Sequence, residues 1–189
     1  MTAVWIVVAV VAVALAWLAF RFNRLIRLRT RTQEAFSEID VELKRRHDLI
    51  PNLVETVKGY ASHERQVFDD VTEARAQAVS ALQTGNPTAM AGAEDALGAT
   101  VTRLFAVAEN YPQLKAADLF LSLQEQLTTT EDKVEYARRF YNGNVRDFNT
   151  ALQTFPTKLY ARVLGFQPYA FFEAADSDRA VPTVQFTTS

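Results

Sequence analysis

The sequence contains no cysteine among its 189 residues. This absence excludes disulfide bonds, thiolate metal ligands and cysteine nucleophiles, while it leaves the cellular compartment open. Histidine is nearly as rare, with His47 and His63 alone. A di-metal helical bundle requires Glu-x-x-His pairs, but Lys44 and Tyr60 stand three residues before the two histidines. We therefore predict no metal site.

Glycine is also scarce, and its six occurrences are scattered along the chain. They form no Gly-x-Ser-x-Gly motif, phosphate-binding loop or dinucleotide-binding motif. The carboxylates are spread over expected helix faces, where solvation alone would place them. The sequence therefore predicts no catalytic residue, no cofactor and no enzymatic activity.

Charge is absent from the first 20 residues, and every one of the 22 acidic residues follows residue 33. Residues 30–189 contain 16 basic and 22 acidic side chains, so this part of the chain carries a net charge of −6. General nucleic-acid binding requires Lys and Arg clustered on one face. Nucleic acid is therefore not an expected partner.

Residues 3–20 form an uncharged, apolar run without a helix breaker. Its length matches the roughly 20 apolar residues that cross a hydrocarbon core of about 30 Å. We therefore predict a transmembrane helix that begins at Ala3 and ends at Phe20. Trp5 and Trp17 lie near its two ends, where aromatic rings favour the membrane interfaces.

Two alternatives to a retained anchor are less compatible with this run. A cleaved signal peptide requires a basic residue before the apolar run and a small-x-small cleavage site. No Lys or Arg precedes residue 21, and the bulky Leu18, Phe20 and Phe22 occupy the cleavage region. A buried core helix is the other alternative, but clustered arginines directly after an apolar run of this length are typical of a membrane anchor.

Five arginines follow the apolar run, and we call them the arginine collar. They are Arg21, Arg24, Arg27, Arg29 and Arg31. Because basic residues favour the cytoplasmic side, we expect the N-terminus outside the cell membrane and the C-terminal domain in the cytoplasm. Arginines beside an anionic leaflet contact lipid headgroups, so membrane lipids are expected partners.

A single helix is predicted to continue from the anchor to about residue 82, because apolar residues recur at three- and four-residue spacing. They are Phe36, Ile39, Leu43, Ile50, Leu53, Val57, Tyr60, Val67, Val71, Ala74, Ala78 and Ala81. Arg46 and Glu64 interrupt this pattern, and each requires partners on another helix or a position at the solvent-exposed edge. We interpret both as charges that set helix register. The expected partner of Glu64 is one of Arg138, Arg139 and Arg146.

Several segments carry a family resemblance. They are RRHDLIPNLVETVKGYASHE (45–64), NYPQLKA (110–116), TEDKVEYARRFYNGNV (130–145), Asn149 and FPTKLYARVLGF (155–166). These segments resemble the LemA family, and the resemblance covers essentially the whole chain. It implies a bacterial membrane-anchored helical bundle whose molecular function is poorly defined. The signature positions are Arg46, Pro51, Asn52, Glu64, Arg138, Tyr141, Asn142 and Asn149.

The rest of the chain predicts three shorter helices. A Gly85-Asn86-Pro87 turn precedes a second helix with Leu97, Val101, Leu104, Phe105 and Ala108 inward, and Pro112 begins a third. The third helix is expected to place Leu114, Ala117, Leu121 and Gln124 on one stripe, beside Phe120, Leu123 and Leu127. Residues 128–131 have capping-box spacing and predict a turn before a fourth helix that ends near residue 154. One unbroken helix over 113–154 is the alternative.

The predicted fold is therefore all-α, with a transmembrane helix that continues into an up-and-down antiparallel four-helix bundle. The expected domains are an anchor with the arginine collar (1–29), the bundle (30–155), a short helix with an aromatic cap (156–172) and a tail (173–189). The tail is expected to be flexible or to dock on a neighbouring chain.

The segment after Pro156 predicts a short helix over 157–164 that Gly165 ends. Its aromatic residues, and apolar residues of the tail, are expected either to cap the bundle or to contact another copy or the bilayer. They are Phe166, Tyr169, Phe171, Phe172, Val184 and Phe186.

These features favour a non-enzymatic scaffold that self-associates and organises or shapes the membrane from its cytoplasmic face. The alternative is a regulatory or sensory adaptor that binds a protein partner. In that alternative a signal would act through the helix bend that Pro51 predicts, because proline removes a backbone donor from the helix.

Overall fold

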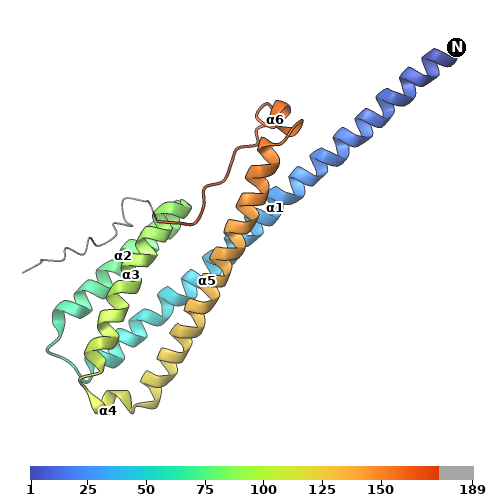
Figure 1. Ribbon diagram of the computed structural model, residues 1–189. Coiled ribbons are helices and arrows are strands. Elements are labelled where there is room, and N and C mark those ends of the chain that lie inside the picture. The colour runs from blue at the N-terminus through green and yellow to red at the C-terminus, as the bar shows by residue number, and fades with distance from the viewer. Residues whose placement is uncertain (175–189) are drawn as a thin grey trace, which may run out of the picture. The chain divides into compact units, whose positions relative to one another are not determined.

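The computed structural model describes residues 1–174, and this part of the chain is helical throughout its regular structure (Figure 1). Its helices are α1 (Thr2–Lys58), α2 (Arg65–Thr84), α3 (Pro87–Ala108), α4 (Pro112–Lys115), α5 (Asp118–Gln153) and α6 (Thr157–Tyr160). The predicted all-α class is confirmed.

Contacts divide the chain into two units, and α1 and α5 contribute to both. The first, which we call the anchor unit, comprises Met1–Ile39 and Ala137–Ala170. The second, which we call the core unit, comprises Asp40–Tyr136 and, among the described residues, 171–174. Each unit contains buried side chains that are described below.

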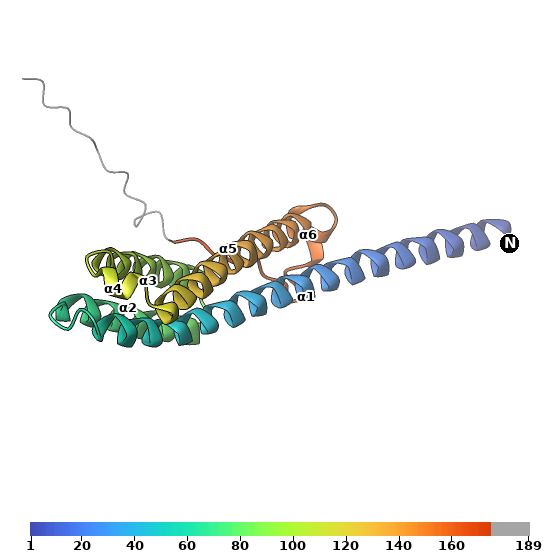
Figure 2. The ribbon, with the colours of Figure 1, turned by 90° about the horizontal axis from the view of Figure 1, so that it is seen from below.

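The N-terminal part of α1 is the one candidate membrane span among the described residues. Its most apolar window has a mean hydropathy of 2.7, and none of that window is buried against the rest of the chain. Figures 1 and 2 show the first turns of α1 without a neighbouring helix. Side chains from Trp5 to Phe20 therefore remain free to contact lipid.

The core unit buries one apolar cluster that five helices share, with Leu114 as the contribution of α4. It contains Ile50, Leu53 and Val57 from α1, Phe68, Val71, Ala74 and Ala78 from α2, Leu97, Val101 and Leu104 from α3, and Phe120, Leu123 and Leu127 from α5. Most of these positions belong to the stripes that the sequence predicts. Leu121 is 49% exposed and Gln124 is also exposed, so the inward face of α5 is the neighbouring stripe of Phe120 and Leu123.

The predicted continuous helix to residue 82 is wrong, because α1 ends at Lys58 and α2 begins at Arg65. Gly59 follows the last helical residue, and glycine weakens a helix through its backbone entropy. The amides of Tyr60 and Ala61 both bond back to the carbonyl of Val57, which closes a turn. Tyr60, counted in the apolar pattern, is consequently 46% exposed. The three- and four-residue spacing of apolar residues thus continues from α1 into α2, although the chain reverses its direction between these helices.

The predicted turn at residues 128–131 is also wrong. Helix α5 runs without interruption through these threonines, and only the short α4 precedes it. Thr128 and Thr130 donate their hydroxyl hydrogen bonds to the carbonyls of Gln124 and Gln126, one turn back along the helix. Threonine satisfies its hydroxyl in this way inside a helix. The alternative of one unbroken helix over 113–154 is therefore close to the observed α5, which spans Asp118–Gln153.

The turn between α2 and α3 follows the sequence prediction. Gly85 adopts a φ of 63°, a left-handed conformation that favours glycine at a helix C-terminus. The Asn86 side chain accepts hydrogen bonds from the amides of Thr88 and Ala89, and Pro87 takes the first helical position. α3 can therefore return along α2 after two residues.

The anchor unit is held together by a small aromatic cluster. Leu25, Phe148, Ala161 and Phe166 are buried, and Phe22 packs edge-on against Phe166 at 6.0 Å between ring centroids. Phe36 of α1 also meets Tyr141 of α5 at 5.5 Å. These contacts place α5 antiparallel to α1 within the unit. Helix α6 is shorter than the predicted 157–164 segment, since it ends at Tyr160.

Two α5 side chains fasten the extended segment that follows Gly165. Asn149 donates from Nδ2 to the carbonyl of Tyr169, and its Oδ1 accepts from the amide of Tyr169, at 2.9 and 3.0 Å. The Tyr141 hydroxyl donates to the carbonyl of Ala170 at 2.9 Å. Both residues belong to the family signature, and their structural role is to satisfy backbone groups of this segment.

The ionisation of Tyr141 offers a direct check on this packing. Burial, with a smaller contribution from Tyr169, raises the pKa of Tyr141 from its ordinary value of 10.0 to about 12. Because the folded state favours the neutral phenol, the stabilisation is complete below pH 10 and is lost as the pH rises through 12. We expect an alkaline absorbance titration of the folded full-length protein to show one tyrosinate that forms late, and the Tyr141→Phe variant to lack it. Complete tyrosine ionisation near pH 10 in the folded protein would contradict this.

Candidate functional site

A buried carboxylate on α3 joins two basic residues of α1. Glu94 is 4% exposed, and its Oε2 accepts a hydrogen bond from Arg46 Nη1 at 3.1 Å. Its Oε1 lies 2.5 Å from His47 Nε2. Arg46 and His47 are themselves 7% and 2% exposed. Both carboxylate oxygens of Glu94 are therefore used inside the core unit, as a buried charge requires.

Arg46 has a second carboxylate partner, on α5. Its Nη2 lies 2.8 Å from Glu131 Oε2, and the Glu131 side chain is 54% exposed. Gly98 lies beside this arginine, since a Cβ there would meet Nη2 at 3.4 Å. Arg46 thus links α1 to both α3 and α5. The prediction that Arg46 pairs with charges on other helices is confirmed.

The helix continues through Pro51 because another side chain replaces the missing donor. Proline at position 51 has no amide hydrogen for the carbonyl of His47, one turn earlier. Arg75 of α2 donates from Nε to that carbonyl at 2.7 Å. The freed carbonyl is therefore satisfied, and the same bond joins α2 to α1. Whether α1 bends at Pro51 stays a prediction.

Four signature positions lie outside these contacts. Asn52 is exposed on α1, while Glu64 is half-buried and immediately precedes α2. Arg138 and Asn142 on α5 both have bonding partners in the folded chain. Glu64 lies between α1 and α2 and not on one continuous helix. The reasoning that placed it beside the arginines of α5 is therefore wrong, while the pairing itself stays a prediction.

The arginine collar occupies the surface of the anchor unit directly after the apolar run. The guanidinium of Arg21 lies 5.7 Å from the ring centroid of Trp17, and that of Arg29 lies 6.0 Å from Phe166. Such cation–π contacts fix the arginines beside aromatic rings. Arg24, Arg27, Arg29 and Arg31 are exposed.

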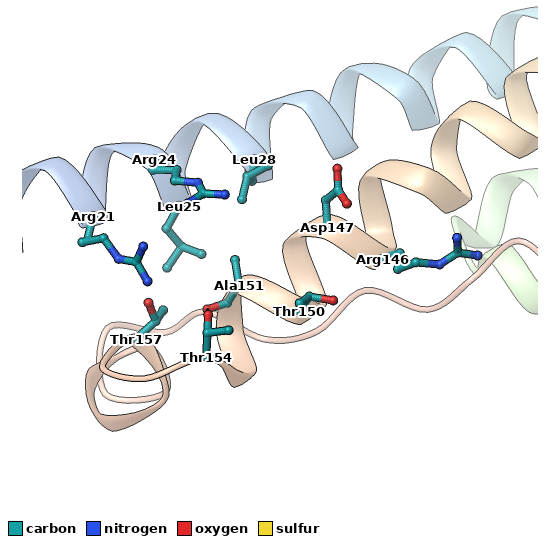
Figure 3. Close-up of a pocket in the computed structure, with 10 residues that line it drawn as sticks. All are labelled: Arg21, Arg24, Leu25, Leu28, Arg146, Asp147, Thr150, Ala151, Thr154 and Thr157. Atoms are coloured by element: carbon teal, nitrogen blue, oxygen red, sulfur yellow. The ribbon is translucent and has the colours of Figure 1, made fainter.

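Arg21 and Arg24 also line a pocket of about 390 Å³ between α1 and the end of α5 (Figure 3). The pocket includes a third arginine, Arg146, and one carboxylate, Asp147. Apolar side chains such as Leu25 complete its wall. It contains more basic side chains than the other described pockets, although a pocket lined by Lys158 and Arg162, with no carboxylate, has the same net charge.

The aromatic segment is divided between buried and accessible side chains. Phe166 is 6% exposed and Phe172 is fully buried, so the chain itself covers these two rings. Tyr169 is half-buried and Phe171 is 37% exposed. Of the predicted oligomer contacts, only this second pair remains accessible in the described structure. Val184 and Phe186 lie outside the described residues.

Sequence reasoning missed Glu94 and Arg75. Glu94 lies three residues before Leu97 and four after Met90, so it continues the buried stripe of α3. Extending the predicted inward face of this helix by one turn would have found it. The sequence contains no comparable signal for Arg75, because its role depends on the His47 carbonyl that Pro51 leaves without a donor. Among residues 1–174, no group of three or more His, Cys, Asp or Glu could hold a metal ion.

Comparison with known families identifies the chain. The model of the LemA family matches residues 35–186. The chain belongs to the LemA family. The match covers all of the contacts of Arg46, Pro51, Tyr141 and Asn149 described above.

Curated relatives of this LemA-family chain are similar over most of its length. Magnetosome protein MamQ 2 of Paramagnetospirillum magneticum is 26% identical over 182 residues, which cover 84% of this chain and 67% of the relative. Magnetosome protein MamQ of Magnetospirillum gryphiswaldense is 25% identical over 192 residues, with 89% and 71% covered. Protein LemA of Metamycoplasma hominis is 27% identical over 160 residues, with 84% and 72% covered. The family, these names and the apolar N-terminal helix indicate a membrane-associated protein.

The two carboxylates that share Arg46 provide a matched pair of substitutions. We expect Glu94→Gln to lower the free energy of unfolding by about 3 kcal/mol, because it removes the carboxylate that bonds buried His47 and leaves buried Arg46 with only the half-exposed Glu131 as a charged partner. Glu131→Gln should cost less than about 1 kcal/mol, because that side chain is half in solvent. Denaturant titration of the full-length protein in detergent, followed by circular dichroism, measures both. An equal loss of unfolding free energy in the two variants would contradict the conclusion that the buried carboxylate contributes more than the exposed one.

The contact between Arg75 and the His47 carbonyl can be tested with a double-mutant cycle. We expect Arg75→Met to cost about 1–3 kcal/mol, because the carbonyl loses its donor. In a Pro51→Ala background the new amide can donate to the same carbonyl, so Arg75→Met should cost clearly less. The same denaturant titrations give the coupling energy. An identical cost in both backgrounds would show that Arg75 acts in another way.

Proposed function

We propose that this LemA-family protein is a non-enzymatic, membrane-anchored scaffold that attaches to the bilayer at two points. The first point is the apolar part of α1 with its arginine collar. The second is the segment around α6. Two attachment points would fix the orientation of the anchor unit on the membrane, which a single flexible anchor does not do.

The observation that carries the proposal is a group of exposed apolar side chains around α6. Phe155, Leu159, Val163 and Leu164 are 79%, 70%, 86% and 52% exposed. Soluble surfaces rarely leave such neighbouring apolar residues uncovered without an interaction partner. The described chain covers none of them well, so the proposal requires an external apolar phase.

The position of α6 favours the bilayer interface as that phase. Thr157 of α6 lines the same pocket as Arg21, the first charged residue after the apolar run of α1. The exposed apolar side chains therefore belong to a segment level with the end of the span. Lys158 and Arg162 are exposed in the same segment and suit an anionic leaflet.

The proposal extends to orientation and assembly. By the distribution of basic residues, the collar and the helical domain would lie in the cytoplasm, with the N-terminus outside. The core unit would act as an up-and-down four-helix bundle formed by α1, α2, α3 and α5. Copies of this chain, or another protein, would bind the bundle and so organise the membrane. The relatives named as magnetosome proteins support a role in such an organised structure.

The absence of cysteine makes single-cysteine labelling a direct test of the second attachment point. We expect a polarity-sensitive dye at Val163→Cys to be blue-shifted and quenched by brominated lipid after reconstitution. Val41→Cys, which is 62% exposed in the core unit, provides the matched control and should report water. Equal exposure of both dyes to water would exclude the α6 contact.

Self-association is tested separately by counting photobleaching steps of labelled full-length protein in vesicles at low density. We expect particles with several chains. Single steps at every protein-to-lipid ratio would contradict the scaffold. A C-terminal tag accessible only from outside intact cells would reverse the proposed orientation.

A further inference from the structure

The pocket beside the arginine collar combines the chemistry of an anion site with an apolar wall. Its volume of about 390 Å³ lies within the range of small-ligand sites, about 300–1,000 Å³. It is formed by α1 directly after the apolar run, by the end of α5 and by α6 (Figure 3).

The charges in this pocket are not balanced within the described chain. Its lining contains Arg21, Arg24 and Arg146 against the single carboxylate of Asp147. None of the three arginines forms an ion pair with a carboxylate among residues 1–174. The pocket therefore carries an excess of positive charge that an external anion can neutralise.

Polar and apolar groups lie side by side at the α6 end of the pocket. Figure 3 shows the Arg21 side chain reaching from α1 towards Thr157, while Arg146 extends in the opposite direction along α5. Thr157 is 4% exposed, and a threonine hydroxyl donates readily to an anionic oxygen. Leu25, 2% exposed, presents an apolar surface next to this end. The arrangement suits an amphiphile with an anionic head.

The position of the pocket selects the source of the anion. Arg21 is the first charge after the apolar run and lies 5.7 Å from the Trp17 ring, a residue type that favours the membrane interface. Phospholipid phosphates are concentrated at this depth. We propose that the pocket binds the phosphodiester of an anionic phospholipid, with Arg21, Arg24 and Thr157 as its main donors.

Asp147 refines the expected headgroup. A carboxylate repels phosphate but accepts a hydrogen bond from a hydroxyl. A phospholipid whose headgroup carries a glycerol hydroxyl therefore fits this pocket better than a bare phosphate ion. The inference deepens the proposed membrane attachment and rests on it, because a pocket at this place meets headgroups only if α1 spans the bilayer.

The test is a lipid titration of full-length protein in zwitterionic detergent, read by native mass spectrometry. The probes are phosphatidylglycerol, phosphatidylcholine and inorganic phosphate. Arg21→Gln/Arg24→Gln removes two charges from the pocket, and Arg27→Gln/Arg31→Gln removes two charges from the same helix outside it. Thr150→Phe narrows the pocket and keeps every charge. Circular dichroism of each variant confirms that the helical content is unchanged.

We expect one tightly bound phosphatidylglycerol per chain and at least about 10-fold weaker binding of phosphatidylcholine. The Arg21/Arg24 variant should lose about 10-fold in affinity for phosphatidylglycerol, the Thr150 variant several-fold, and the Arg27/Arg31 variant less than about 2-fold. Millimolar phosphate should not displace the lipid.

Equal losses in the two double variants would overturn the proposal and leave only diffuse attraction to the collar. Displacement by phosphate would overturn it in favour of a site for the free ion. Neither result depends on self-association or on the α6 contact, which are measured in vesicles with the dye and photobleaching experiments. A failed scaffold and a failed lipid site therefore give different results.

Discussion

The buried carboxylate of Glu94 is the interaction on which the packing of the core unit most depends. Its two oxygens are taken by Arg46 and His47 of α1, and Arg46 reaches on to Glu131 of α5. An unpartnered charge at buried Glu94 or Arg46 would cost several kcal/mol. The observed packing of α1 against α3 satisfies both carboxylate oxygens of Glu94 inside the core unit.

A second constraint acts one turn later on α1. Pro51 leaves the His47 carbonyl without an amide, and Arg75 of α2 satisfies it from the side. His47 thus bonds to α3 through its ring and to α2 through its backbone. Arg46 and His47 together therefore join α1 to α2, α3 and α5.

The anchor unit is stabilised differently from the core unit, by a small apolar cluster and by hydrogen bonds to backbone groups. Its buried cluster of Leu25, Phe148 and Phe166 is small, and Asn149 and Tyr141 hold an extended segment by its backbone groups. The collar and the exposed apolar side chains around α6 remain on the outside. The anchor unit therefore has a packed, hydrogen-bonded interior and a surface with both basic and apolar side chains. This surface supports the proposed two-point membrane attachment.

Much of the candidate site was readable from residue order because its signals are local. The apolar run, the collar, the turn at Gly85-Asn86 and most of the buried stripes depend on spacing along one helix. The need for Arg46 to find partners also followed from its place in an apolar stripe. The identity of those partners did not follow, because Glu94 and Glu131 lie on helices whose relative register is a property of packing.

What the sequence determined by itself is the all-α class, the apolar helix at the start of the chain and the family. Tertiary structure alone decided where the helices break. Tyr60 and Val67 continue the apolar pattern of α1, yet the chain reverses after Lys58, because Ala61 and the apolar face of α2 are buried by packing back on α1. Residues 128–131 suggest a cap, yet α5 passes through them. Periodicity measures which residues prefer burial, and it carries no information on whether the chain continues straight or folds back to achieve that burial.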